Sequence, residues 1–267
     1  MKYCIVTIIK NEQKYLDEWL QYHINLGIDN IFVFEDTGSD SHHDICNKYN
    51  NVTLLPIEFT NNIIFITNKR ISQVARYQRI IYYLKYKYDF DWVIYIDVDE
   101  FLTLQDNNNT LDNIFEQFME YDFVQLQWMN YNANNHIYLQ DNVINSYTEK
   151  CGFLKEQIIH NSRSKLAINM NHWKLHLFSH NHHQVFKGNY CKTNFGKNKD
   201  IMCYDKIYIR HYITKSFEDW VYKIFIRGQF YNSKKFNDFF ILNPNMDKKQ
   251  LMELIPSIIQ KYNNKIL

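Results

Sequence analysis

The stretch WVIYIDVDEFL, residues 92–102, joins an apolar run to three carboxylates within four positions. Residues 92–96 favour β structure and predict a buried strand. Asp97, Asp99 and Glu100 belong outside its interior, because burying an unpaired carboxylate costs roughly several kcal/mol. The carboxyl end of a buried strand is where an open α/β sheet binds its ligand. Acidic residues that merely open a solvated loop are the simpler alternative.

Asp97 and Asp99 have the spacing of a cation site. Two residues apart, their side chains share one face of an extended chain. Carboxylate oxygens suit Mg²⁺ or Mn²⁺, which would keep open positions for the oxygens of a diphosphate. The pattern therefore indicates a metal-assisted diphosphate site, although a bare D-x-D is common by chance.

Upstream of this segment, predicted strands alternate with predicted helices. The strands are expected at 3–9, 30–34 and 52–59, and the helices at 12–26, 41–49 and 69–88. Asn11 can cap the first helix and Gly27 can end it. Such alternation implies a parallel sheet with helices on both faces. Neither G-x-G-x-x-G nor G-x-x-x-x-G-K-[ST] occurs, so a bound diphosphate would have to rest on a metal.

The chain beyond residue 106 is less regular. We expect a helix at 111–121, a strand at 123–128 with one solvent-facing side, and a strand at 207–212. A helix capped by Ser216 should follow over 216–228, and a segment at 247–262 should be interrupted or kinked by Pro256. Residues 130–165 are polar and Asn-rich, which fits either loops around an acceptor site or a surface insertion.

Composition excludes several classes of protein. The 267 residues suit one large domain, and the 46% hydrophobic content is ample for a core. A net charge of +1 offers no basic surface for nucleic acid. The sequence contains no run of about 18 apolar residues, so we predict no membrane span. The five cysteines are scattered without a C-x-x-C pair, which is typical of reduced thiols and predicts a cytoplasmic protein.

Further candidates lie at the predicted strand ends and on the third helix. Thr7 and Asp36 should approach Asp99 at one edge of the sheet, and Asp36 could accept from the imide N–H and ribose hydroxyl of uridine. Asp36 could equally start a turn. Arg76 and Arg79 could pair with Asp97 or contact a diphosphate, although an exposed helical arginine is the commoner outcome.

Histidines form the densest cluster of possible ligands, at residues 172, 176, 180, 182 and 183. The segment lacks H-E-x-x-H, so a dedicated zinc site is less favoured than polar loop residues. His211 stands apart at the end of a predicted strand, where a neutral imidazole can bind a metal. Lys215 follows near a helix N-terminus, which favours an anion.

Three motifs, taken in order, resemble a known group. They are TIIKNE (7–12) followed by YLDEWLQYHINLG (15–27), IDVDEF (96–101) and RHYITKSFE (210–218). Together they are similar to nucleotide-sugar glycosyltransferases of the GT-A fold, in the family-92 and family-2-like group that transfers galactose and related sugars. The likeness covers most of residues 3–102 and 207–228. It departs at residues 35–39, where EDTGS replaces the usual Asp-Asn-x-Ser turn.

This resemblance implies an α/β fold of GT-A type, with a mostly parallel, Rossmann-like sheet flanked by helices in one domain. Residues 1–106 would be the nucleotide-sugar-binding half, 107–230 the acceptor-side half with an irregular region, and 231–267 a C-terminal helical tail. The donor would be a UDP-sugar, the acceptor a glycan or other hydroxyl compound, and the cofactor Mn²⁺ or Mg²⁺.

The resemblance also implies roles for individual residues. By position in the motifs, Asp97 would contact the ribose or the metal, and Asp97, Asp99 and His211 would be metal ligands. Together with the residues argued above, we expect donor contacts from Thr7, Glu12, Asp36, Arg76, Asp97 and Lys215. An inverting reaction needs a base, for which Glu149, Glu156 and Asp141 are candidates, whereas a retaining reaction needs none. The alternatives are a sugar-nucleotide nucleotidyltransferase, for which the chain lacks a Gly-rich basic N-terminal loop, and a catalytically inactive GT-A binding module.

Overall fold

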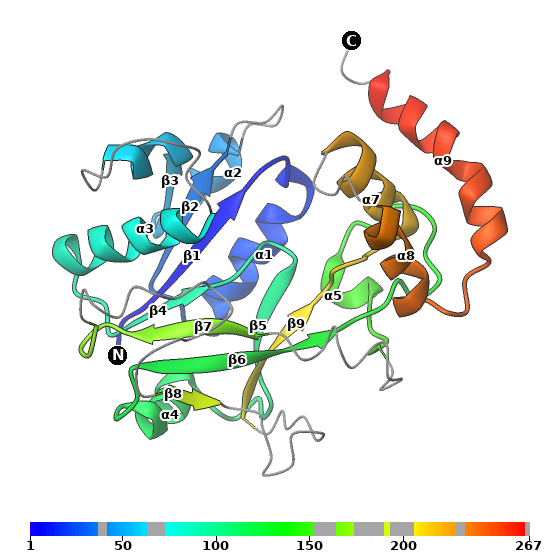
Figure 1. Ribbon diagram of the computed structural model, residues 1–267. Helices are drawn as coiled ribbons and strands as arrows, with labels where there is room; N and C mark the ends of the chain where they lie inside the picture. The colour runs from blue at the N-terminus through cyan, green and yellow to red at the C-terminus, as the bar shows by residue number, and fades with distance from the viewer. Residues whose placement is uncertain are drawn as a thin grey trace. The chain divides into compact units, whose positions relative to one another are not determined.

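The computed structural model describes residues 1–36, 42–62, 73–151, 164–173, 190–192, 206–227 and 233–264. Within these residues the strands belong to one sheet, in the order β3-β2-β1-β4-β7-β6-β9-β5, with β8 paired to β6 (Figure 1). The strands are β1 (Tyr3–Ile9), β2 (Asn30–Glu35), β3 (Val52–Pro56), β4 (Trp92–Tyr95), β5 (Glu100–Leu104), β6 (Phe123–Asn130), β7 (Ser164–Asn169), β8 (Tyr190–Lys192) and β9 (Ile207–His211).

The N-terminal half of the sheet is parallel, as the alternating pattern predicts. β1 pairs in parallel with both β2 and β4, and β2 pairs in parallel with β3. Antiparallel pairing begins at β7, which lies between β4 and β6. The predicted α/β architecture is confirmed, and the carboxyl ends of β1, β2 and β4 lie at one edge of the sheet.

The described helices connect the strands or follow the last strand in the chain. They are α1 (Gln13–Leu26), α2 (His43–Cys46), η1 (Ile57–Asn62), α3 (Gln73–Lys87), α4 (Leu111–Phe115), η2 (Glu116–Phe118), α5 (Val143–Ser146), α7 (Phe217–Val221), η4 (Tyr222–Ile226), α8 (Ser233–Leu242) and α9 (Lys248–Asn263). Gly27 ends α1 with a left-handed φ of 103°, a backbone conformation that glycine adopts without strain.

Four predicted elements need correction. The third strand stops at Pro56 and continues as the 3-10 helix η1. The helix predicted over 216–228 is α7 followed by the π-helix η4. α9 runs through Pro256 without interruption. β6 lies between β7 and β9 in the strand order and has no solvent-facing side, since seven of its eight residues are buried.

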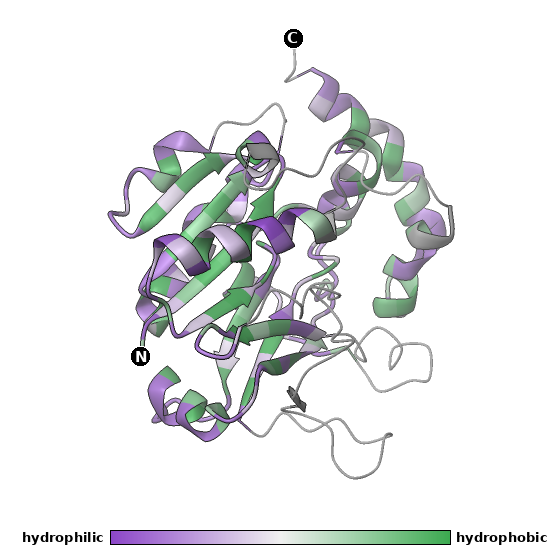
Figure 2. Ribbon diagram, turned by 60° about the vertical axis from the view of Figure 1, so that its left-hand side comes forward, coloured by the Kyte–Doolittle hydropathy of each residue, from purple (hydrophilic) through white to green (hydrophobic). Residues whose placement is uncertain are grey.

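Two compact units make up the chain. The first comprises Met1–Trp128 and Ser162–Ile209, the second Met129–Asn161 and Arg210–Leu267. In the first, α3 packs its buried residues, among them Ile80 and Leu84, against one face of β1, β2 and β4. In the second, apolar residues of α7, α8 and α9 pack together, including Phe217, Phe239 and Leu251. Figure 2 shows the mostly hydrophobic strands and the amphipathic helices.

Helix α1 is tied to β5 by side chains that bond to its backbone. The Trp19 indole donates to the carbonyl of Glu100 (2.7 Å), and the Tyr22 hydroxyl donates to that of Leu102 (2.9 Å). The N–H of Leu102 donates to Nε2 of the fully buried His23 (3.1 Å). These bonds fix the strand that follows the acidic residues. Among the described helices, none has the length and apolar character to cross a bilayer.

Candidate metal and nucleotide site

The acidic residues form a tight turn between β4 and β5. The N–H of Glu100 donates to the carbonyl of Asp97 (3.0 Å), and the N–H of Asp97 donates back to Oε2 of Glu100 (2.9 Å). The turn is therefore closed by a backbone bond and by a side chain. Asp97 keeps a partly exposed side chain, whereas Asp99 is buried and Glu100 is fully buried. The expectation that these carboxylates leave the strand interior holds for Asp97 and Asp99, but not for Glu100, which opens β5.

A buried lysine compensates this charge. Lys165 lies on β7 and is fully buried, and its Nζ is 2.7 Å from Oδ2 of Asp97 and 3.4 Å from Oε2 of Glu100. Burial lowers the lysine pKa, but the charges of Asp97 and Glu100 outweigh it and leave the pKa raised. Burial also raises the pKa of Glu100 well above its usual range, against the opposing effect of Lys165. The ammonium of Lys165 thus pairs with the Asp97 carboxylate and contacts the carboxyl group of Glu100.

Sequence reasoning missed Lys165. It lies 68 residues from Asp97, in a segment that reads as polar loop. Strand pairing brings it to the turn: Ile94 pairs with Ala167 in antiparallel register, so Lys165 is level with Ile96. The only available signal was a lysine beside the apolar run 166–168, which in isolation predicts nothing about Asp97.

The predicted donor-binding residues of the first unit lie on or next to strands β1 and β2 and on helix α3. Thr7 is fully buried inside β1, and its Oγ1 has no hydrogen-bond partner among the described residues. Asp36 directly follows β2, and its N–H donates to the carbonyl of Ile9 (2.8 Å). Arg76 is half-buried on α3. Arg79 is buried rather than exposed and donates to the carbonyl of Thr60 (3.0 Å).

In the second unit, His211 ends β9 and is buried. Its Nδ1 is 2.8 Å from Oδ1 of the buried Asn130. An amide oxygen only accepts, so Nδ1 carries the proton and the ring lone pair lies on Nε2. Such a bond to the other ring nitrogen is the usual support of a metal-ligating histidine. Lys215 is buried with a left-handed φ of 48°, just before Ser216, which caps α7 in a capping box with Asp219.

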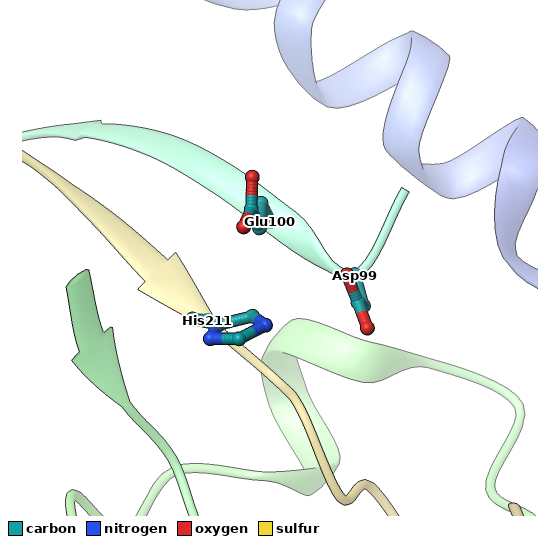
Figure 3. Close-up of side chains that lie close together, drawn as sticks. All are labelled: Asp99, Glu100 and His211. Atoms are coloured by element: carbon teal, nitrogen blue, oxygen red, sulfur yellow. The ribbon is translucent and has the colours of Figure 1, made fainter. Parts of the chain in front are cut away.

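One group of side chains has the composition of a metal site. Asp99, Glu100 and His211 each offer a ligand atom, and these atoms lie within 4.8 Å of one another (Figure 3). Two ligands of one Mn²⁺ or Mg²⁺ can be up to about 4.2 Å apart, so the group fits such an ion after a small contraction. Carboxylates with an imidazole suit Mn²⁺. Asp97, which pairs with Lys165, is not one of the three.

Other candidates from the sequence are spread more widely. Glu149 and Asp141 are exposed, and Glu149 accepts a bond from Asn132 (3.2 Å). Glu156 and the histidines at 176, 180, 182 and 183 lie outside the described residues. His172 is half-buried beside Asp122, at 3.5 Å.

A family comparison identifies the group to which this architecture belongs. The family model described as glycosyltransferase family 92 matches residues 1–263. The chain belongs to glycosyltransferase family 92. This confirms the resemblance carried by the three motifs.

Curated relatives support the same family over a shorter stretch. A family 92 protein of Oryza sativa subsp. japonica is 24% identical over 115 residues, and one of Ricinus communis is 25% identical over 117 residues. Each match covers 43% of this chain, but only 18% and 19% of the respective relatives. The chain thus spans less than a fifth of their length in these matches.

Solved structures give distant similarities. Glucosyl-3-phosphoglycerate synthase from Mycobacterium tuberculosis, in complex with Mn²⁺, UDP and phosphoglyceric acid, matches with a TM-score of 0.34 and 12% identity, over 48% of this chain and 43% of that one. HddC from Yersinia pseudotuberculosis matches with a TM-score of 0.39 and 11% identity, over 71% of this chain and 89% of that one.

Proposed function

We propose that this family 92 protein is a metal-dependent transferase that moves a hexose, such as galactose or glucose, from a UDP-sugar to a hydroxyl group of a glycan or similar acceptor. The observation that carries the proposal is the acidic turn from Asp97 to Glu100. It lies at the carboxyl end of β4, where the parallel neighbours β1 and β2 also end and where an α/β sheet binds its ligand.

The metal would be held by Asp99 and His211, with Glu100 beside them. Asp97, already fixed by Lys165, would accept from a ribose hydroxyl or reach the metal from its second oxygen. A bound Mn²⁺ or Mg²⁺ would supply positive charge to the diphosphate leaving group. Lys215 would add a second positive charge to that group, and Arg76 a third.

Nucleoside contacts are assigned to the ends of β1 and β2. Thr7 and Asp36 would frame the uracil edge and Glu12 the adjoining loop, which supports a preference for UDP over purine nucleotides. The fit is chemical: Asp36 offers an acceptor for the imide N–H or for a ribose hydroxyl.

The transfer itself forms one bond and breaks one. The acceptor oxygen attacks the anomeric carbon, the bond from that carbon to the β-phosphate oxygen breaks, and UDP leaves with the bonding electrons. In an inverting reaction the acceptor proton passes to a carboxylate, for which Glu149, Asp141 and Glu156 remain candidates. In a retaining reaction the leaving phosphate can take it.

Isothermal titration of UDP in the presence of Mn²⁺, with the Asp99→Asn variant, tests this proposal. The variant keeps the side-chain shape and removes the charged ligand, so UDP affinity should fall at least about tenfold, the size of one lost charged contact. Glu116→Gln, an exposed acid in η2, is the matched control and should bind like wild type. Equal affinity in Asp99→Asn and wild type would contradict the metal assignment.

Product analysis then separates the alternatives. A transferase releases UDP from a UDP-sugar in the presence of Mn²⁺. A nucleotidyltransferase instead forms a nucleotide sugar and pyrophosphate from UTP and a sugar phosphate. An inactive binding module binds UDP and releases nothing.

A further inference from the structure

His42 occupies a position that none of the motifs includes. It immediately precedes α2 and is buried, with 1% of its surface exposed. Both ring nitrogens have partners from other elements. Nδ1 contacts Oε1 of Glu35, the last residue of β2, and Nε2 is 3.2 Å from the backbone N of Glu12, which precedes α1.

These partners fix the protonation of the ring. The N–H of Glu12 can only donate, so Nε2 must accept and carries no proton. Nδ1 then carries the proton and donates to the Glu35 carboxylate. The backbone N–H of His42 also donates to Oε1 of Glu35 (3.3 Å), so one carboxylate oxygen holds this residue by its ring and by its backbone.

The contacts of His42 with Glu35 and Glu12 lie at the end of the paired strands β1 and β2. β1 and β2 pair as far as Ile9 and Glu35, and the N–H of Asp36 still bonds to Ile9. The chain then leaves β1 through Asn11, whose φ of 52° is left-handed, and reaches Glu12. The paired register of β1 and β2 ends before that turn. Beyond it, the imidazole of His42 connects Glu35 of β2 with Glu12.

We infer that His42 is a positioning residue for the nucleoside half of the donor site. It sets the spacing between the loop that carries Glu12 and the strand end that carries Asp36. The inference rests on the proposed function, since both residues are nucleoside contacts only if the protein binds UDP. In this role His42 acts through Glu12 and Glu35, which it contacts. Its effect should concern the base, while the acidic turn recognises the diphosphate.

A matched pair of variants separates the two bonds of His42. In His42→Asn the amide can still donate to Glu35, but it is too short to accept from Glu12. In His42→Gln the amide oxygen can reach the Glu12 N–H. Both variants remove the ring, so their packing losses are similar. His23→Asn is the control, because His23 is equally buried and also accepts a backbone N–H, from Leu102.

The dissociation constants of UDP and ADP are measured with Mn²⁺ by isothermal titration, and each variant's melting temperature is recorded. We expect UDP affinity to fall about five- to tenfold in His42→Asn, the effect of one lost hydrogen bond, with ADP affinity changed less than about twofold. His42→Gln should retain most of the preference for UDP. His23→Asn should lose thermal stability and keep the UDP-to-ADP ratio.

Three outcomes overturn the inference. If both His42 variants bind UDP like wild type, His42 positions nothing. If UDP and ADP affinities fall in parallel, its role is only structural. If wild type itself binds no UDP with Mn²⁺, the proposed function fails and this inference fails with it, which distinguishes that case from the first two.

Discussion

Replacing Lys165 by methionine removes a buried cation that holds the acidic turn, while keeping the length of the side chain. Lys165 and Glu100 are both fully buried, and the ammonium lies 2.7 Å from Asp97 and 3.4 Å from Glu100. Removing one partner of a buried ion pair costs about 3–5 kcal/mol, because the other charge remains unpaired. Asp97 is partly exposed and Glu100 already has a raised pKa. Water and proton uptake should therefore limit the loss to about 3 kcal/mol.

Urea unfolding at neutral pH measures this loss directly. In thermal unfolding, a loss of about 3 kcal/mol in the free energy of unfolding lowers the midpoint temperature of a chain of this size by roughly 6–12 °C. Lys85→Met is the control, since Lys85 donates to the carbonyl of Met170 (2.6 Å) from a partly buried position. It should cost about 1 kcal/mol. The same Lys165 variant should bind UDP and Mn²⁺ more weakly, because Asp97 loses its fixed partner.

A double variant decides whether charge is the cause. Lys165→Met with Glu100→Gln removes a buried cation and a buried carboxyl group together, so stability should recover by about 1–2 kcal/mol relative to the single variant. The reasoning is refuted if Lys165→Met is within about 0.5 kcal/mol of wild type, or if the double variant is less stable than the single one.

His211→Ala should lower Mn²⁺-supported turnover more than about tenfold. Asn130→Ala should weaken Mn²⁺ affinity by about tenfold while the ligand remains; a Mn²⁺ titration at saturating donor checks both, and unchanged dependence in His211→Ala would make that residue structural. In the second unit, burial raises the Glu218 pKa, but Lys261 (2.5 Å) and other donors outweigh it and leave the pKa lowered. The stabilisation that ionised Glu218 gains from its partners is present above the unfolded pKa of glutamate near 4.3. It is lost as the pH falls through the lower pKa of the folded state. Lys261→Met should therefore cost about 1 kcal/mol at pH 7 and almost nothing in strong acid, unlike the exposed control Lys249→Met, and a gap that persists in acid would disprove the pairing.

Local patterns in the sequence were enough for the parallel half of the sheet. β1, α1, β2 and β4 lie where the apolar periods predict them, and Gly27 ends α1 as expected. The position of the acidic turn also follows from sequence, because an apolar run that ends in carboxylates has few other placements. The family could be recognised from three motifs for the same reason, since each of them is short and contiguous.

The rest depended on contacts between distant segments. The alternating pattern of β6 predicts one solvent-facing side, but seven of its eight residues are buried. The pattern of β6 does not specify which distant segments pack against it. Glu100 can be buried only because Lys165 reaches it from β7. His42 can act as a positioning residue only in the folded chain, where Glu35 of β2 and the N–H of Glu12 both contact its ring. The residues that could bear charge at the strand ends were recognisable from the amino-acid sequence, because periodicity and local chemistry are properties of short segments. The tertiary structure alone decided which partner neutralises each charge, because pairing energies act across tens of residues and depend on burial that no short segment specifies.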